Sequence, residues 1–230
     1  MFELNLQFFG GRGSSSGGRG GGKMSFSNGK WSGSVGDTNN ETLRSAIGTK
    51  GSPKSIGDAT VGTNPNYHGD YKEYSENCQR CVVAYEARRR GYDVTAQPTF
   101  RGDTLNQVAY NDTKSGIARG RWMGAFQNAK PVNVSAKTEA GVMKNIDDKM
   151  ANYGNGSRGV IQIFYKGGGG HVFNVERQNG KTVYVEAQTG KIKDFKTTLK
   201  SVRTEKVALV RTDKLKFSER AKNFVKQSKK

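Results

Sequence analysis

Two cysteines and two histidines are the residues in this sequence best suited to nucleophilic or metal-binding chemistry. Cys78 and Cys81 form a single Cys-x-x-Cys unit, whereas His68 and His171 stand far apart in the chain. A structural zinc site needs four nitrogen or sulfur ligands, and these four residues are irregularly spaced. One Cys-x-x-Cys unit also provides no long-range disulfide, which fits a reducing compartment. We therefore expect thiol catalysis without a metal or another cofactor.

Cys78 stands where a helix is predicted to begin. From Asn77 onward, apolar residues recur at helical spacing, and Gly91 follows as a C-cap would. The positive potential at a helix N-terminus stabilises a thiolate, so Cys78 is the candidate nucleophile. Cys81, one turn later, is the alternative nucleophile. Asn77, Gln79 or the backbone N–H groups of this turn are the candidate oxyanion donors.

The base for such a thiol is expected on a β-hairpin later in the chain. The Asn-Gly dipeptide at 179–180 favours a two-residue type I′ turn between two strands. Continuing the register outward from this turn places His171 opposite Gln188, and Phe173 opposite Glu186. Directly paired residues share a face of the sheet, so His171, Glu186 and Gln188 project from one side. We expect His171 to act as the base, Glu186 to orient its ring and Gln188 to support the site.

The elements expected around these residues form an α+β fold, with a helix first and antiparallel strands after it. A second amphipathic helix is predicted over residues 138–151, behind Thr138 as N-cap. Strands are predicted over residues 160–165, 171–177 and 181–188, with shorter elements at 92–96, 122–127 and 207–211. A helix-borne cysteine that faces a histidine on an antiparallel sheet is the arrangement of papain-like cysteine hydrolases.

Composition divides the chain into three predicted parts. Residues 1–63 are rich in Gly, Ser, Asn and Thr and include the low-complexity stretch 10–22, so we expect a flexible, disordered N-terminal region. Residues 64–212 hold the predicted catalytic domain. Residues 213–230 are predicted to be a basic C-terminal tail.

The net charge of +18 is concentrated toward the C-terminus. Residues 191–230 contain 14 Lys or Arg and four acidic residues, a net charge of +10. Such a field attracts nucleic acid, acidic proteins or anionic membrane surfaces, unless the charges only solvate the chain. The run of Arg88, Arg89 and Arg90 has two similar interpretations, a solvated helix face or a nucleic-acid contact.

The sequence predicts neither a membrane span nor a secretory signal. No apolar run approaches the roughly 20 residues that cross a bilayer. The opening MFELNLQFFG lacks a basic n-region and a cleavage site. We expect a soluble protein of the bacterial cytoplasm or of a phage virion. The virion is one of these two expectations because LNLQFFGGRGSSSG resembles the opening of proteins encoded in phage head-gene clusters. This resemblance implies a phage origin and phage head proteins as partners.

Two blocks of the chain resemble a known family. NCQRCVVAYEARRRGYDV and GHVFNVERQNGKTVYVEAQTG are similar to the papain-fold toxin domain of bacterial polymorphic toxin systems, a group similar to bacterial glutamine deamidases. Members carry Asn-Cys at the helix start, Gly-His at a strand start and an acid before Gln-x-Gly. Here Cys78, His171 and Glu186 occupy these positions, with Glu186 in place of the more common Asp. The resemblance covers residues 64–212 and implies a protein substrate and an immunity protein as a partner.

A second pattern bears on the choice between the two cysteines. Related peptidases of bacteriocin exporters begin their catalytic helix with Asp-Cys, followed three positions after the Cys by a small residue. On this pattern Cys78 is the nucleophile, and Cys81 takes the place of the small packed residue.

Three functions fit the sequence. The first is thiol-dependent hydrolysis of glutamine side chains by a toxin or effector of phage origin. The second is a cysteine peptidase, or a transamidating enzyme, that uses the same residues. The third is a non-enzymatic basic phage structural protein that binds nucleic acid or the capsid through its basic tail.

Overall fold

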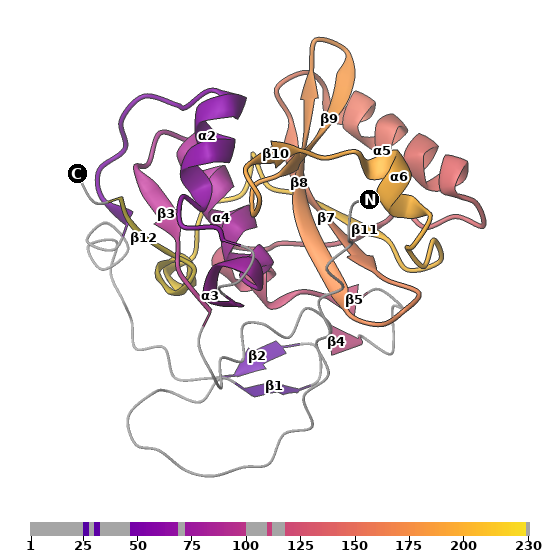
Figure 1. The fold of residues 1–230 in the computed structure, drawn as a ribbon, viewed down its shortest axis with the longest axis horizontal. Helices are drawn as coiled ribbons and strands as arrows, with labels where there is room; N and C mark the ends of the chain where they lie inside the picture. The colour runs from indigo at the N-terminus through magenta and orange to yellow at the C-terminus, as the bar shows by residue number, and fades with distance from the viewer. Residues whose placement is uncertain are drawn as a thin grey trace.

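A six-stranded antiparallel sheet lies at the centre of the described chain (Figure 1). The structure, a computed structural model, describes residues 25–27, 30–32, 47–68, 72–99, 110–111 and 118–228. In spatial order the strands of the sheet are β10 (Lys191–Ile192), β9 (Lys181–Glu186), β8 (Gly170–Gln178), β7 (Arg158–Phe164), β11 (Ala208–Arg211) and β6 (Val132–Asn133). Each neighbouring pair is antiparallel, and together with the helices this confirms the predicted α+β class.

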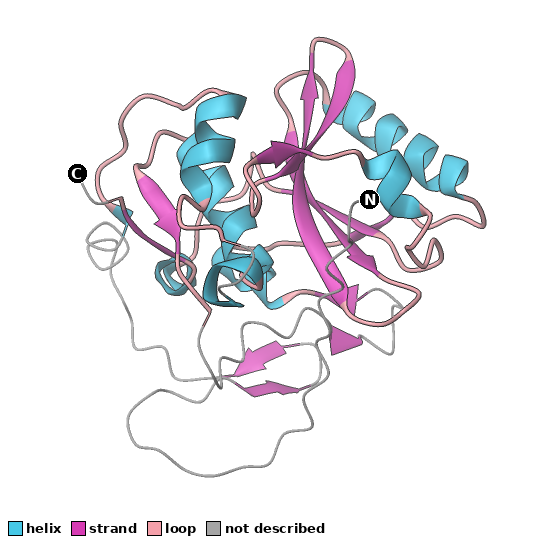
Figure 2. Cartoon of the chain, in the orientation of Figure 1, coloured by secondary structure: helices cyan, strands magenta, loops and turns pink. Residues whose placement is uncertain are grey.

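Helices cover both faces of this sheet (Figure 2). One face carries α4 (Cys78–Arg89), with α2 (Ile56–Thr63) and the 3₁₀ helix η2 (Arg121–Ala125) packed beside it. The other face carries α5 (Glu139–Tyr153) and α6 (Phe195–Leu199). The remaining elements are the helix α3 (Lys72–Ser75), the 3₁₀ helix η3 (Glu219–Asn223) and the strand pairs β3 (Val94–Ala96) with β12 (Val225–Gln227), β1 (Ser25–Ser27) with β2 (Lys30–Ser32), and β4 (Tyr110–Asn111) with β5 (Ala118–Arg119).

The central strands are apolar on both sides because each side packs against helices. On β7, Val160 packs in the core on the α4 side, whereas Ile161 and Ile163 pack in the core on the α5 side. The same alternation places Val172 of β8 toward α4 and Phe173 toward α5. A strand buried on both faces reads as a nearly continuous apolar run. A polar residue within such a strand is therefore buried as well.

α4 is buried along most of its length although it carries several charged residues. The helix begins after Asn77 and ends at Arg89, ahead of Gly91, which has φ +100°. A Cβ at Gly91 would lie 2.2 Å from the carbonyl oxygen of Gly51, so only glycine fits this exit. The predicted helix and its closing glycine are confirmed.

α5 also follows its predicted pattern. The Thr138 side chain caps the helix by accepting a hydrogen bond from the backbone N–H of Gly141 at 3.1 Å. Val142, Ile146 and Met150 are fully buried against the sheet, as their spacing of four residues requires.

The β8–β9 hairpin has the predicted turn and a shorter ladder than expected. Asn179 and Gly180 have φ of +49° and +75°, which suits a type I′ turn. The pairing runs outward from this turn and ends at Asn174 with Val185. The register predicted from Gln178 and Lys181 is confirmed, but the ladder stops before the expected pairings of Phe173 with Glu186 and of His171 with Gln188. The physical reason is a turn at residues 187–190, after which β10 folds back onto the outer edge of β9.

The chain before residue 64 contributes to the fold, so the expected boundary at 63 is also wrong. Ala59 of α2 is fully buried, and Ile47 is buried in the same core on the α4 side. These apolar contacts offset the entropy of ordering a segment rich in small polar residues. The expected flexibility of the first 46 residues concerns a stretch that lies almost wholly outside the described residues.

Residues 213–228 are integrated as well, and the prediction of a separate basic tail is wrong for them. Phe217, Phe224 and Val225 are buried in the core on the α4 side. β12 pairs with β3, which places the last described strand beside the strand that follows α4.

Within the described chain, none of the helices combines the length and apolar character needed to cross a bilayer.

Candidate active site

His171 and Glu186 meet at one end of the central hairpin. His171 is the second residue of β8, and Glu186 is the last residue of β9. The distance from His171 Nε2 to Glu186 Oε2 is 2.6 Å, and both residues are buried. The two side chains thus touch although their backbones are not ladder partners.

Cys78 approaches the same imidazole from the start of α4. It is buried, with 1% of its surface exposed, and its thiol lies close enough to His171 to help raise the pKa of the imidazole. Because Glu186 holds Nε2, Nδ1 is the ring nitrogen that remains for the thiol. The ring therefore lies between a sulfur and a carboxylate, the order in which a thiol, its base and an orienting acid work together.

The charges of the site follow from these contacts. Burial disfavours the charged imidazole, but the Glu186 carboxylate and the hydrogen bond with Cys78 outweigh burial and raise the pKa of His171 to about 9. Burial also opposes ionisation of Glu186, yet His171 and Lys193 together lower the pKa of Glu186 to about 2. At neutral pH the ring is a cation and the acid an anion. A cationic ring beside a sulfur stabilises a thiolate.

Cys81 lies in a different environment from Cys78. Its Sγ donates to Asn77 Oδ1 at 3.2 Å. Burial, reinforced by the nearby Cys78 and Glu186, raises the pKa of the Cys81 thiol well above its usual value. A thiol held neutral is a poor nucleophile, so these surroundings favour Cys78 as the reacting cysteine.

A network of buried side-chain amides fixes the start of α4 against the turn that follows Glu186. Gln188 Nε2 donates to Asn77 Oδ1 at 3.3 Å and to the Ser75 carbonyl at 2.9 Å. Asn64, which follows α2, donates from Nδ2 to the Gln188 carbonyl at 2.9 Å and accepts from Asn77 Nδ2 at 3.2 Å. Asn77 and Gln188, expected as oxyanion or supporting residues, are thus joined in this network. The sequence analysis missed Asn64, and its only signal was its place after a helical stretch.

Gln79 is anchored to the 3₁₀ helix η2. Its Oε1 accepts a hydrogen bond from the backbone N–H of Trp122 at 3.0 Å, which ties the first turn of α4 to η2. Within the described residues, no group of three or more His, Cys, Asp or Glu side chains is placed to hold a metal ion. His68 is exposed on the loop after α2.

Comparison with known proteins adds the family. A family model described as papain fold toxin 1, glutamine deamidase, matches residues 76–191, which is half of the chain. The chain belongs to this family. The matched residues of this papain-fold toxin include α4 and the β7–β9 part of the sheet, and with them Cys78, His171 and Glu186. Searches of curated proteins and of solved structures found no match.

The match confirms the resemblance expected from the two sequence blocks, both of which it contains. It makes the papain-fold toxin a hydrolase-type enzyme by family. The phage-like opening of the chain lies outside the matched residues and outside the described ones, so a phage origin stays a prediction.

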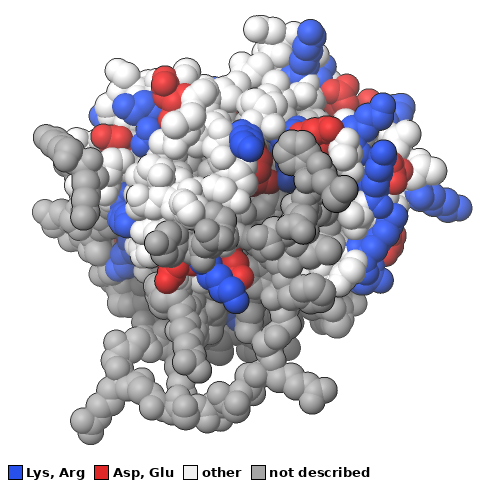
Figure 3. All heavy atoms as spheres, in the orientation of Figure 1, with Lys and Arg blue, Asp and Glu red and all other residues white. Residues whose placement is uncertain are grey.

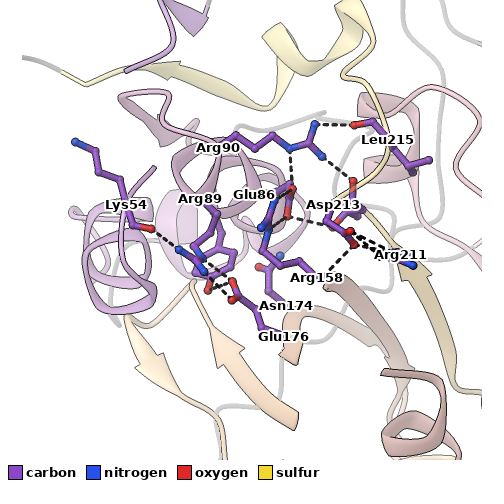
Figure 4. Close-up of polar contacts among 12 residues, drawn as sticks. Lys54, Glu86, Arg89, Arg90, Arg158, Asn174, Glu176, Arg211, Asp213 and Leu215 are labelled. Atoms are coloured by element: carbon purple, nitrogen blue, oxygen red, sulfur yellow. Dashed lines mark hydrogen bonds and ion pairs between the residues drawn. The ribbon is translucent and has the colours of Figure 1, made fainter. Parts of the chain in front are cut away.

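The arginine run of this papain-fold toxin belongs to its interior rather than to a binding surface (Figure 4). Arg89 donates from Nε and Nη2 to the fully buried Glu176 at 2.7 and 3.0 Å. Arg90 donates from Nε to the fully buried Glu86 at 2.7 Å. Arg88 is buried and donates to the Val94 carbonyl at 3.0 Å. Neither expected interpretation, a solvated face or a nucleic-acid contact, describes these side chains.

Further contacts of Arg90 hold the C-terminal segment against the end of α4. Arg90 donates from its two Nη atoms to the carbonyls of Leu215 and Thr212, each at 2.6 Å, and its guanidinium lies 4.4 Å from the centre of the Phe217 ring. Arg158 of β7 holds the other side of Glu86 at 2.9 and 3.0 Å. Much of the charge counted from sequence therefore has a structural role.

Part of the remaining positive charge lies on the side of the papain-fold toxin that carries α5 and α6. Lysine and arginine side chains crowd the side where α5 and α6 lie (Figure 3). Exposed members near α6 are Lys191, Lys196, Lys200, Arg203 and Lys206. Attraction to nucleic acid or another polyanion remains a prediction for this surface.

Proposed function

We propose that this papain-fold toxin hydrolyses the side-chain carboxamide of glutamine in a protein substrate. Cys78 is the nucleophile, His171 carries the proton and Glu186 orients the ring. One observation carries the proposal: the His171 ring contacts Glu186 at 2.6 Å and interacts with the Cys78 thiol inside a buried site. The family description, glutamine deamidase, supports glutamine as the target.

The reaction follows from the positions of these groups. The Cys78 sulfur, its proton held by His171, attacks the carboxamide carbon, and the carbon–nitrogen double-bond character is lost in a tetrahedral oxyanion. The oxyanion collapses, the carbon–nitrogen bond breaks, and His171 gives its proton to the departing ammonia. Water, deprotonated by His171, then attacks the thioester, releasing glutamate and the free thiol. Each turnover consumes one water and releases one ammonia.

The first turn of α4 is suited to stabilise the oxyanion. The first N–H groups of a helix lack intrahelical acceptors and carry the positive end of the helix dipole. Cys78 is itself the first residue of α4, so these N–H groups lie beside the reacting sulfur. The side chain of Asn77 is occupied in the amide network, which favours backbone donors over Asn77 for this role.

Conversion of glutamine to glutamate in protein substrates tests the proposal against its closest alternatives. The purified chain is incubated with a mixture of bacterial proteins, and the products are analysed by mass spectrometry for glutamine-to-glutamate conversion, for new peptide termini and for amine adducts. We expect conversion that requires Cys78 and His171. New termini without conversion would identify a peptidase, and adducts without conversion would identify a transamidating enzyme. If no glutamine is converted and no Cys78-dependent product forms, the non-enzymatic alternative remains.

A further inference from the structure

The acid of the site is shared between two cations. Lys193, which follows β10, places its Nζ 2.6 Å from Glu186 Oε2, the same oxygen that lies 2.6 Å from His171 Nε2. The Lys193 side chain is only 12% exposed, and its Nζ lies over the Phe173 ring, 5.0 Å from the ring centre. The lysine is thus held between an aromatic face and a buried carboxylate, directly after β10.

The two oxygens of the Glu186 carboxylate differ in their contacts. Glu186 Oε1 is buried and accepts no hydrogen bond from the residues that the structure describes. Both of these contacts of the carboxylate fall on Oε2, and the orientation of the group is set by His171 and Lys193 together. Removing one of them leaves the carboxylate with a single partner.

We infer that Lys193 is a positioning residue of the active site, which fixes Glu186 and moderates how strongly this acid holds the proton of His171. The inference rests on the proposed function, because it assigns a role within the same set of residues. Lys193 acts through the carboxylate that it shares with His171 and through its own charge.

The charge of Lys193 predicts the direction of its effect. Two nitrogens that each lie 2.6 Å from one oxygen are no more than about 5 Å apart, a distance at which like charges repel appreciably in a buried site. Lys193 therefore opposes the positive charge on His171, and removing the lysine raises the pKa of His171 further. The other titratable groups that interact with the carboxylate are Cys81 on α4 and Tyr165, which follows β7, while Cys78 lies beside the imidazole and Arg80 interacts with Cys81. They are unchanged by the substitution.

The pH profile of thiol alkylation tests this role without a known substrate. The rate of Cys78 alkylation by iodoacetate is measured against pH in a Cys81→Ala background, so that one cysteine remains. The anionic reagent is favoured by the imidazolium, so the rate falls at high pH as His171 loses its proton. We expect Lys193→Met to move this alkaline limb upward by about one pH unit. Lys193→Arg, which keeps the charge, and Lys191→Met, on exposed Lys191 two residues away, should leave the limb in place.

Each outcome decides a different claim. An unshifted limb in folded Lys193→Met overturns the role of Lys193 and leaves the proposed function intact. An equal shift in Lys191→Met also overturns it, because the effect would then be a general change of surface charge. A wild-type chain that shows no imidazole-dependent limb overturns both this inference and the proposed function. Lys193→Gln, which lacks the charge but keeps a polar end, gives the same measurement should Lys193→Met fail to fold.

Discussion

At the residue scale, the opposite charges of His171 and Glu186 hold the site together over a defined pH range. The cationic ring and the anionic acid lie 2.6 Å apart inside the protein, where each is stabilised by the other. The two cysteines lie in different electrostatic surroundings. Burial and nearby negative groups keep Cys81 neutral, whereas Cys78 lies beside the cationic His171 ring.

Substitutions of the reacting set should have graded effects on activity. Cys78→Ala and His171→Ala are each expected to lower glutamine hydrolysis by at least about 1,000-fold, because nucleophile and base act as a unit. Glu186→Gln should lower it less, roughly 100-fold, because the ring keeps a partner but loses an orienting charge. Cys81→Ala should retain most activity. Initial rates of ammonia release measure all four, and equal losses in Cys81→Ala and Cys78→Ala would contradict the assignment.

The raised pKa of His171 also predicts how stability depends on pH. A group whose pKa rises from 6.5 in the unfolded chain to about 9 in the folded one stabilises the fold fully below pH 6.5. This contribution is lost as the pH rises through 9. The free energy of unfolding of the wild type should therefore fall by on the order of 2 kcal/mol more than that of His171→Gln over this range. Urea unfolding at several pH values measures the difference, and parallel curves would show that the pairing adds no stability.

At the scale of elements, α4 is positioned by polar contacts at both ends. Its start is joined through Asn77 to Asn64 and Gln188, and its last turns are joined through arginines to buried acids on β8 and on α4 itself. A helix carrying a nucleophile needs such anchoring because its position sets the distance between the sulfur and the imidazole.

Breaking one buried ion pair should be far more damaging than breaking an exposed one. Arg89→Met leaves the fully buried Glu176 carboxylate with Tyr85 and Gln178 as its remaining partners. We expect a loss of about 3–5 kcal/mol in the free energy of unfolding. Lys144→Met, which removes an exposed pair with Asp148 on α5, is the matched control and should leave stability nearly unchanged. Similar losses in both variants, measured by urea unfolding, would refute the structural role of the arginine run.

At the scale of the whole molecule, the C-terminal segment belongs to the core on the α4 side. Phe217, Phe224 and Val225 are buried there, although the sequence around them is dominated by charge. Removing residues 217–230 would therefore expose apolar surface as well as remove lysines. The attraction to polyanions is better tested by changing exposed lysines than by truncation.

One core substitution separates the two roles of this segment. Phe224→Ala should lower the free energy of unfolding by about 3–5 kcal/mol, because a fully buried aromatic ring leaves a cavity. The triple substitution of Lys196, Lys200 and Lys206 to Gln should leave stability nearly unchanged and make heparin binding weaker and less dependent on salt. Thermal unfolding and heparin elution measure both. A stable Phe224→Ala variant would mean that the segment is the independent tail expected from sequence.

Sequence reasoning reached the two central helices, the hairpin turn and the family because each has a local signal. Helical spacing marked α4 and α5, and an Asn-Gly pair marked the β8–β9 turn. Lys193 and Asn64 were missed because their roles depend on the turn at 187–190, which reverses the chain after Glu186. The arginine run was misread because charge alone does not show which acids lie opposite. Its partner Glu176 comes from β8, many residues away in the sequence.

The most direct test of the central claim is the identity of the reactive thiol. Wild type, Cys78→Ala, Cys81→Ala and His171→Ala are treated at neutral pH with a limiting amount of iodoacetamide, and the labelled cysteine is located by mass spectrometry. If Cys78 is the nucleophile paired with His171, labelling is fast at Cys78 in the wild type and in Cys81→Ala, slow in His171→Ala and absent from Cys81 in Cys78→Ala. Fast labelling of Cys81 in Cys78→Ala, or equal labelling of Cys78 with and without His171, would contradict the account.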